Sequence, residues 1–263
     1  MIKIHFSIQG KGGCGKTTDA AFMAQYLVNQ DRYPLCLDAD PVNRSFAAYK
    51  SLDVHEINVL DGNKIHPKSW DAMLNLLLQA SEDAVVDVGA TSFIAILDYM
   101  SRMDMIRYLH DHGRQVYMHI PVTGSEGMIH TVNGMVQIIN QFQDQNTRFA
   151  IWLNPFLGPI ERNGQQFEQF EEFLKLKSKI EAIIKIPAFP PDLHGEDLKS
   201  ILTQNMTFTE ALTLDTRSVQ DPGSGEDEEE KYSVHGLSLA TLQRLTQMQR
   251  EIFVAIRESQ VFD

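Results

Sequence analysis

The chain has 263 residues, of which 43% are hydrophobic, so it is long enough to bury a substantial core. Its 23 lysines and arginines against 35 aspartates and glutamates leave a net charge of -12, which argues against a surface coated in basic residues for nucleic-acid binding. The sequence has neither an apolar N-terminal segment of signal-peptide length nor a run of about 20 apolar residues, so we expect a cytoplasmic protein. Its cysteines, Cys14 and Cys36, lack a Cys-x-x-Cys spacing, and we expect neither disulfides nor a metal cluster.

Short apolar runs alternate with longer helical patterns along the chain, an order typical of βαβ units and a parallel sheet. The order begins with a strand over 2–9, a helix over 17–29 and a strand over 34–39. Further strands are expected over 84–88, 116–120, 149–154 and 182–186. Further helices are expected over 70–79, 101–112, 127–142 and 164–179. We therefore predict an α/β fold in which a mostly parallel, twisted sheet carries helices on both faces.

The composition changes at 215–231, where an Asp-Pro-Gly-Ser-Gly stretch leads into an acidic run over 226–230. Like charges repel and nothing here can be buried, so we expect a disordered loop, with an acidic docking segment as the alternative. Apolar residues then recur at helical spacing and predict an amphipathic helix over 236–258. We expect this helix to pack back onto a single domain that comprises residues 1–263, the alternative being a helix on a membrane surface.

The first strand runs into Gly-Lys-Gly-Gly-Cys-Gly-Lys-Thr over 10–17, which fits the phosphate-binding pattern G-x-x-x-x-G-K-[ST]. In this pattern, glycines let the backbone wrap around phosphates, while successive N–H groups and a helix N-terminus face the negative oxygens. We expect Lys16 to contact the β- and γ-phosphates of ATP and the Thr17 hydroxyl to ligate Mg²⁺. The expected nucleotide cradle comprises Gly10, Gly12, Gly13, Cys14, Gly15, Lys16, Thr17 and Thr18.

A second lysine, Lys11, follows the first glycine and gives the order Lys-Gly-Gly-x-Gly-Lys-Thr. This order resembles the deviant Walker A family, which contains the ParA and MinD partitioning and positioning ATPases and the nitrogenase iron protein. The resemblance implies that Lys11 reaches the nucleotide of a partner subunit, so that ATP joins two copies of the chain. A second cation at the triphosphate would offset the charge that develops during phosphoryl transfer. An exposed lysine in a mobile loop is the alternative.

Two later strand ends carry acids in the order that this family implies. The stretch Leu-Asp-Ala-Asp-Pro over 37–41 looks like its second motif, and a carboxylate there can orient the attacking water and hold the Mg²⁺ shell. We assign this role to Asp40, with Asp38 as the alternative, although either acid can simply cap the following loop. The strand that ends at Asp87 is similar to a Walker B segment, in which Asp87 holds Mg²⁺ through water and the Gly89 N–H senses the γ-phosphate.

Two further residues fit base recognition in the same family. Asn154 ends an apolar strand, and its amide can pair with adenine, while Pro187 follows an apolar run whose backbone would line the base. Asparagine and proline also simply terminate strands, so both interpretations of each residue stay open.

Stretches beyond these motifs look like the TraL family of conjugal transfer proteins from IncP-type plasmids, over about the first 215 residues. They cover 9–13, 34–43, 49–50, 87–93, 152–155 and 158–161. The acidic insertion over 215–231 departs from that family. The order Asp-Val-Gly-Ala over 87–90 replaces the Asp-Thr-Pro-Pro usual in ParA proteins, which puts a ParA-like switch geometry in doubt. We find no counterpart of the arginines with which ParA proteins grip DNA.

These features predict a slow, partner-stimulated Mg-ATPase switch. ATP binding favours a homodimer, hydrolysis dissolves it, and the cycle positions or recruits proteins of a conjugative transfer or secretion apparatus. Direct contact with DNA stays open, although the net charge does not favour it. A nucleotide-dependent scaffold with little turnover is one alternative, and a P-loop small-molecule kinase or ligase is another, although no second polar pocket is marked. An Fe–S electron carrier is excluded because the sequence lacks paired cysteine ligands.

Overall fold

The computed structural model describes residues 1–62, 64–213 and 237–263. Seven strands form one sheet in the order β11-β8-β7-β1-β6-β2-β3, and every neighbouring pair in it is parallel. The strands are β1 (Ile2–Ser7), β2 (Leu35–Asp38), β3 (His55–Glu56), β6 (Ala84–Asp87), β7 (Arg114–Thr123), β8 (Arg148–Asn154) and β11 (Ile180–Lys185). Two short antiparallel ribbons lie outside this sheet: β4 (Leu60–Asp61) with β5 (Lys64–Ile65), and β9 (Glu161–Arg162) with β10 (Gln165–Gln166).

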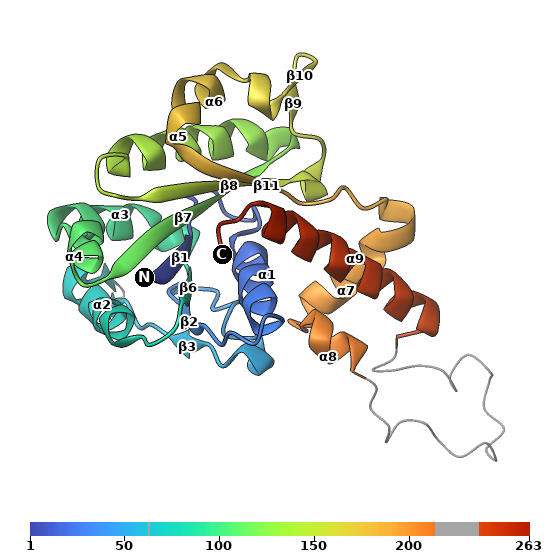
Figure 1. Cartoon of the computed structure of the whole chain (residues 1–263), viewed down its shortest axis with the longest axis horizontal. Coiled ribbons are helices and arrows are strands. Elements are labelled where there is room, and N and C mark those ends of the chain that lie inside the picture. Colours follow the sequence, from blue (N-terminus) through green and yellow to red (C-terminus); the bar gives the residue numbers. More distant parts are fainter. Residues whose placement is uncertain (63, 214–236) are drawn as a thin grey trace.

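Helices cover both faces of the sheet, as Figure 1 shows. One face carries α2 (Trp70–Gln79), α3 (Phe93–Arg102), α4 (Met105–Asp111), α5 (Met128–Phe142) and α6 (Glu171–Leu176). The other carries α1 (Lys16–Val28), α7 (Glu196–Thr203), α8 (Phe208–Leu212) and α9 (Leu239–Glu258). Successive side chains of a strand point to opposite faces, so Ile4 and Phe6 of β1 enter the first apolar layer while His5 and Ser7 face α1. The predicted parallel α/β fold is confirmed.

Two of the expected helices are wrong in detail. Instead of one helix over 101–112, α3 ends at Arg102 and α4 begins at Met105, because Asp104 adopts the left-handed backbone conformation with φ 47°. The expected helix over 164–179 is replaced by β10, short 3-10 turns and the six-residue α6. Its apolar spacing comes from three phenylalanines that pack against one another across these turns: Phe167, Phe170 and Phe173.

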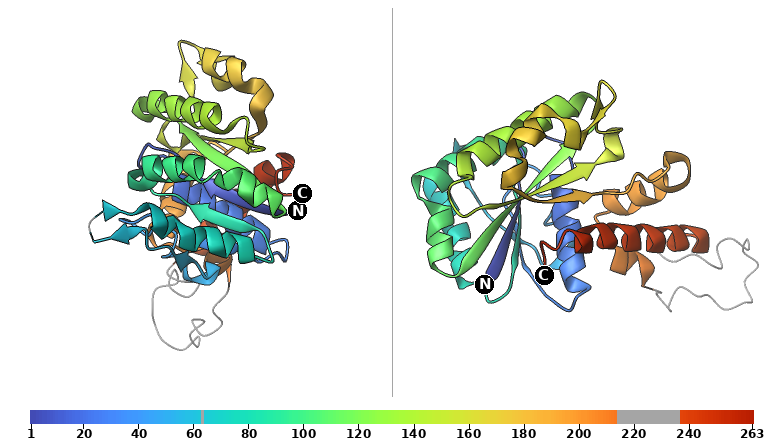
Figure 2. Two further views of the ribbon diagram at one scale, coloured as in Figure 1. Left: turned by 90° about the vertical axis from the view of Figure 1, so that its left-hand side faces the viewer. Right: turned by 45° about the horizontal axis from the view of Figure 1, so that its top comes forward.

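The C-terminal part of the chain packs on the face that carries α1. Figure 2 shows α9 lying beside α1, where the Tyr26 and Phe253 rings meet edge to face with centroids 5.7 Å apart. The expected final helix over 236–258 thus corresponds to α9, which buries Leu245, Met248 and Ile252 against the domain. The expected acidic loop over 215–231 lies outside the described residues. Within the described ranges, no helix is both long and apolar enough to cross a membrane.

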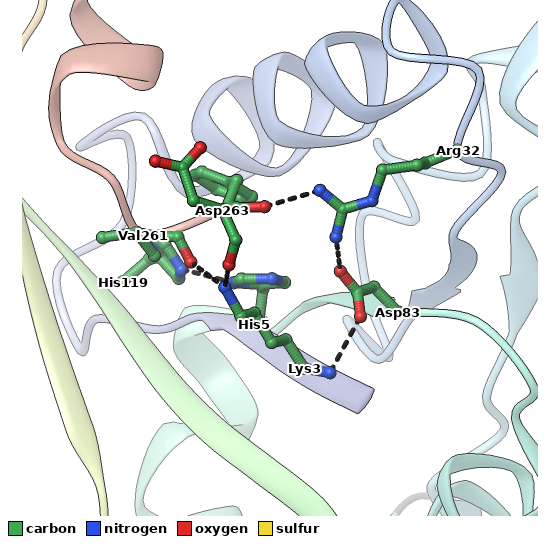
Figure 3. Close-up of polar contacts among 8 residues, drawn as sticks. Lys3, His5, Arg32, Asp83, His119, Val261 and Asp263 are labelled. Carbon is green, nitrogen blue, oxygen red and sulfur yellow. Dashed lines mark hydrogen bonds and ion pairs between the residues drawn. The ribbon is translucent and has the colours of Figure 1, made fainter. Parts of the chain in front are cut away.

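The last residues tie the C-terminus to the beginning of β1 (Figure 3). The Lys3 ammonium donates to the carbonyl oxygen of Val261 at 2.9 Å and also to that of Asp263. Arg32 donates to the Phe262 carbonyl at 2.5 Å and forms an ion pair with Asp83. The Phe262 side chain is thereby held inside the fold, where it is 2% exposed.

Candidate nucleotide site

The predicted site residues follow the carboxyl ends of parallel strands, which meet at one edge of the sheet. The loop from Ile8 to Gly15 joins β1 to α1, and Gly13 and Gly15 adopt φ values of 69° and 101° that favour glycine. The loop is held at both ends by buried side chains. The Ser7 hydroxyl donates to the Lys16 carbonyl at 2.8 Å, and Gln9 accepts the Gly10 N–H at 2.9 Å.

Two of the loop glycines, Gly15 and Gly10, lie where a side chain would collide with a neighbour. A Cβ placed on Gly15 would lie 2.6 Å from the Asn154 Nδ2 atom, so the amide of Asn154 sits directly on the loop. A Cβ on Gly10 would lie 2.9 Å from the Phe93 ring, while Gly12 faces the Ala90 methyl at 4.0 Å. The loop therefore packs between β8 on one side and the start of α3 on the other.

Lys16 and Thr17 sit at the beginning of α1, as expected for phosphate and metal contacts. The Lys16 ammonium donates to the Lys11 carbonyl at 3.1 Å, and the lysine is 8% exposed. The Thr17 hydroxyl donates to Asp87 Oδ2 at 2.6 Å. Asp87 Oδ1 is buried and has no hydrogen-bond partner among the described residues. Thr18, the next residue of α1, is half-buried.

The Thr17–Asp87 pair fits a divalent cation. Burial is the main cause that raises the pKa of Asp87 to about 7, the Thr17 hydrogen bond opposes it, and the Asp38 charge adds to it. A buried carboxylate with one free oxygen, next to a hydroxyl, is the all-oxygen donor set that Mg²⁺ prefers. A bound cation would compensate the charge that burial makes costly.

Asp38 and Asp40, the two candidates at the end of β2, differ in their surroundings. Asp38 is buried and both of its oxygens are engaged, Oδ1 by the Asp40 N–H and Oδ2 by the Ala47 N–H, each at 2.9 Å. Asp38 therefore shapes the loop that follows the strand. Asp40 is half-exposed, and its Oδ1 accepts the Val42 N–H at 2.9 Å, so it also caps a turn. Its carboxylate lies so close to Gly89 that a Cβ there would be 2.5 Å from Asp40 Cγ.

Lys11 is exposed, and its side chain forms no ion pair with the carboxylates of the described residues. It lines a cavity of about 620 Å³ together with Gly12, Gly13, Cys14, the loop Thr123–Gly127 and His130. The Cys14 thiol donates to the Lys11 carbonyl at 3.0 Å, and burial raises its pKa to about 11, which keeps it protonated at neutral pH. Lys11 thus stands at the open side of the loop.

The two candidates for base contact lie at the ends of neighbouring strands. Asn154 Oδ1 accepts the Phe156 N–H at 3.1 Å, so the amide caps the turn after β8 while its NH₂ group faces Gly15. Pro187 follows β11, and the preceding Ile186 N–H donates to the Leu153 carbonyl at 3.0 Å. The structure therefore places Asn154 against the phosphate loop. It shows no such contact for Pro187.

Sequence reasoning missed two buried residues of the site. Gln9 donates to the carbonyls of Pro121 and Thr131, at 3.1 and 3.0 Å, and so ties the loop to β7 and α5. Asp19 of α1 is 0% exposed, and neither carboxyl oxygen has a partner among the described residues. Burial, followed by the charge of Asp87, raises its pKa well above the usual range. The signal for Asp19 was present, since this acid directly precedes the apolar run over 20–24 of α1.

Comparisons with known proteins bear on the family and on the fold. No family model matches the chain. It is 40% identical over 212 residues to Protein TraL of Escherichia coli, covering 81% of this chain and 88% of that protein. A second Protein TraL of Escherichia coli is 36% identical over 219 residues, covering 83% and 90%.

Among solved structures, the MinC:MinD cell division protein complex of Aquifex aeolicus matches with a TM-score of 0.51 at 14% identity, over 97% of this chain and 96% of that chain. A likeness at this identity shows a shared P-loop fold. The sequence matches reach further, because they cover most of both proteins at 36% to 40% identity. The chain belongs to the TraL family.

Proposed function

We propose that the chain binds Mg-ATP at the loop over 10–17 and hydrolyses it slowly, as a switch that accompanies conjugative DNA transfer. The observation that carries this proposal is the contact of 2.6 Å between the Thr17 hydroxyl and Asp87, beneath a glycine loop that ends at Lys16. Asp87 Oδ1 is buried and unpaired among the described residues. A turn with only a structural role would leave no such oxygen unpaired, whereas a Mg-nucleotide site uses a carboxylate oxygen of this kind. The TraL family membership supports the conjugative role.

Each residue has a role that follows from its chemistry. Lys16, freed from the Lys11 carbonyl, neutralises the terminal phosphates, and the loop N–H groups bind their oxygens. Thr17 and Asp87 hold Mg²⁺, which supplies positive charge to the phosphates when it is bound. Asp40 orients the water that attacks the γ-phosphorus; the bond to the β-phosphate oxygen breaks, and ADP and phosphate leave. Asp38 holds the loop that carries Asp40.

We further propose that ATP joins two copies of the chain through Lys11. The exposure of Lys11 on a cavity beside the loop supports this role. Four apolar side chains that follow the carboxyl ends of the strands are between 58% and 66% exposed. Exposed apolar side chains at the same edge of the sheet as the loop support a protein partner there. They are Val42, Ile94, Ile129 and Phe156. We propose a cytoplasmic location, where ATP is available, with transfer or secretion proteins as further partners.

Light scattering after size-exclusion chromatography tests the switch. In saturating Mg-ATP we expect an Asp40→Ala protein to be dimeric, because it binds the nucleotide but hydrolyses it slowly. The double variant Lys11→Ala/Asp40→Ala should stay monomeric and still bind ATP. The matched control is Lys68→Ala/Asp40→Ala, which removes another exposed lysine and should dimerise like Asp40→Ala.

Phosphate release and plasmid transfer test the rest. In the transfer assay, a plasmid that lacks the gene is complemented either with the unaltered gene or with the Lys16→Ala variant. Equal transfer frequencies in the two cases would contradict a role for ATP in transfer. Undetectable phosphate release, with and without DNA, would favour a scaffold, while release that depends on a small metabolite would favour a kinase or ligase. An Asp40→Ala protein that stays monomeric both with and without Mg-ATP would contradict the ATP-dependent dimer.

A further inference from the structure

Asp19 is the buried polar group that the proposed chemistry leaves unused. It lies on α1 one turn after Gly15, whose carbonyl accepts the Asp19 backbone N–H at 2.8 Å. The side chain is fully buried, and both carboxyl oxygens lack a donor among the described residues. Buried polar groups are almost always hydrogen-bonded, because an unpaired one costs free energy on folding. A donor for Asp19 is therefore to be sought close to the phosphate loop.

The Asn154 amide faces Asp19 across Gly15. A Cβ placed on Gly15 would lie 2.6 Å from Asn154 Nδ2 and 3.9 Å from Asp19 Oδ1, so the two groups flank the same point. The orientation of the amide is fixed by the Phe156 N–H, which donates to Asn154 Oδ1 and leaves the NH₂ group on the side of Gly15. Glycine at position 15 keeps the space between amide and carboxyl free.

Neighbouring donors do not bond to Asp19. The Thr17 hydroxyl donates to Asp87, and the Lys16 ammonium donates to the Lys11 carbonyl and forms no hydrogen bond with Asp19. The NH₂ group of Asn154 has two N–H donors, and neither has an acceptor recorded among the described residues. An acceptor without donors and a donor without acceptors thus lie on either side of Gly15.

We propose that Asp19 is a positioning residue for the base of the nucleotide. In the structure the two groups are not hydrogen-bonded. When the nucleotide binds, the Asp19 carboxyl accepts one N–H of Asn154 across Gly15, and this contact directs the second N–H toward an acceptor nitrogen of a purine. Asp19 itself does not touch the nucleotide. The inference rests on the proposed binding of a nucleotide at the loop over 10–17.

A double-mutant cycle measured with two probes tests this role. Calorimetry gives the Kd of ADP and of inorganic pyrophosphate, which lacks the base, for the full-length protein, Asp19→Ala, Asn154→Ala and the double variant. We expect Asp19→Ala to weaken ADP binding about tenfold, which corresponds to the loss of one hydrogen bond, and to leave pyrophosphate binding unchanged. In the Asn154→Ala background, Asp19→Ala should cause no further loss of ADP affinity, because the group it positions is gone.

The conservative variant and thermal unfolding separate positioning from a structural role. Asp19→Asn retains a carbonyl oxygen for the Asn154 N–H, so its ADP affinity should stay within about twofold of the unaltered protein. Its melting temperature should not fall, because no buried carboxyl is left unpaired.

Additive losses in the cycle, or an Asp19→Ala protein that loses pyrophosphate together with ADP, would overturn the positioning role. Unaltered protein that binds neither probe would instead overturn nucleotide binding itself. If the unaltered protein and Asp19→Ala bind ADP with the same Kd, the positioning role of Asp19 is wrong. The proposed nucleotide binding is then unaffected.

Discussion

His5 and His119 form a hydrogen bond in the core, with His5 Nδ1 2.9 Å from His119 Nε2 (Figure 3). The direction of the bond follows from Trp152, whose indole N–H can only donate and donates to His119 Nδ1 at 2.8 Å. A neutral His119 therefore carries its proton on Nε2 and donates it to His5. The proton of His5 is left on its own Nε2, which is buried without an acceptor among the described residues. Both rings are thus held in their neutral form.

We expect the contribution of these two histidines to the free energy of unfolding to fall as the pH drops below about 6.5, the usual histidine value. Burial lowers the pKa of His119 to about 3. Burial also lowers the pKa of His5 well below the usual range, and the charge on the neighbouring His119 lowers it further. At these two side chains the unfolded chain therefore binds more protons than the folded chain across this window, so their contribution to stability rises with pH there. The slope is about 1.4 kcal/mol per pH unit for each neutral histidine. Urea unfolding between pH 5 and pH 8 measures it.

The matched control is the double variant His5→Gln/His119→Gln, which keeps an amide oxygen for the Trp152 N–H. Carboxyl groups with raised pKa values, among them Asp19 and Asp87, act with the opposite sign, because the folded chain then binds more protons than the unfolded one. Their contribution is common to both proteins and cancels in the difference. Parallel stability curves for the two proteins would show that the histidines do not titrate on unfolding.

Replacing Phe262 by alanine should destabilise the protein by about 3 kcal/mol, in the range for large aromatic side chains removed from a core. The ring stacks on His5 with centroids 4.6 Å apart and meets Tyr26 at 5.6 Å. Chemical denaturation at pH 8 gives the change. Phe156→Ala is the matched control, because Phe156 is 61% exposed and its removal should leave the midpoint in place. Equal midpoints for both variants would mean that the C-terminal segment adds nothing to stability.

The edge of the sheet that holds the candidate nucleotide site was predictable, because motif order and parallel topology together determine it. Once the strands before Gly10, Asp40 and Gly89 are parallel, their carboxyl ends must meet at one edge of the sheet. The side-chain contact between Thr17 and Asp87 follows from the same rule, since each begins or ends an element at that edge.

Contacts that depend on tertiary register were not predictable. His5 pairs with Tyr117 in the β1–β7 register, and its ring reaches His119 two residues further along, which neither strand shows on its own. The burial of Asp19 depends on how α1 packs on the sheet. The helix expected over 164–179 failed because the spacing of Phe167, Phe170 and Phe173 is also satisfied by consecutive turns around one small cluster.

Gly89→Ala should slow ATP turnover about tenfold while ATP affinity changes by less than about twofold. Its Cβ would lie between 2.5 and 2.8 Å from the atoms of the Asp40 carboxyl group, so that group must move. Phosphate release at saturating Mg-ATP and calorimetry with ATP measure the two quantities. In an Asp40→Ala background the same change should cost no further turnover, because the displaced carboxylate is absent. A tenfold loss in that background would point to the Gly89 N–H itself.

Asp87→Asn should change the response to Mg²⁺ and the stability of the free protein in opposite directions. The substitution removes a buried carboxylate whose Oδ1 is unpaired, so the melting temperature without ligand should stay equal or rise. The neutral amide is a poorer ligand for Mg²⁺, so adding Mg²⁺ to the ATP-bound variant should stabilise it less than it stabilises the unaltered protein. Thermal unfolding in EDTA, in ATP with EDTA and in Mg-ATP gives both effects. Asp53→Asn, an exposed acid, serves as the control. An Asp87→Asn protein that gains as much from Mg²⁺ as the control would exclude Asp87 from the metal site.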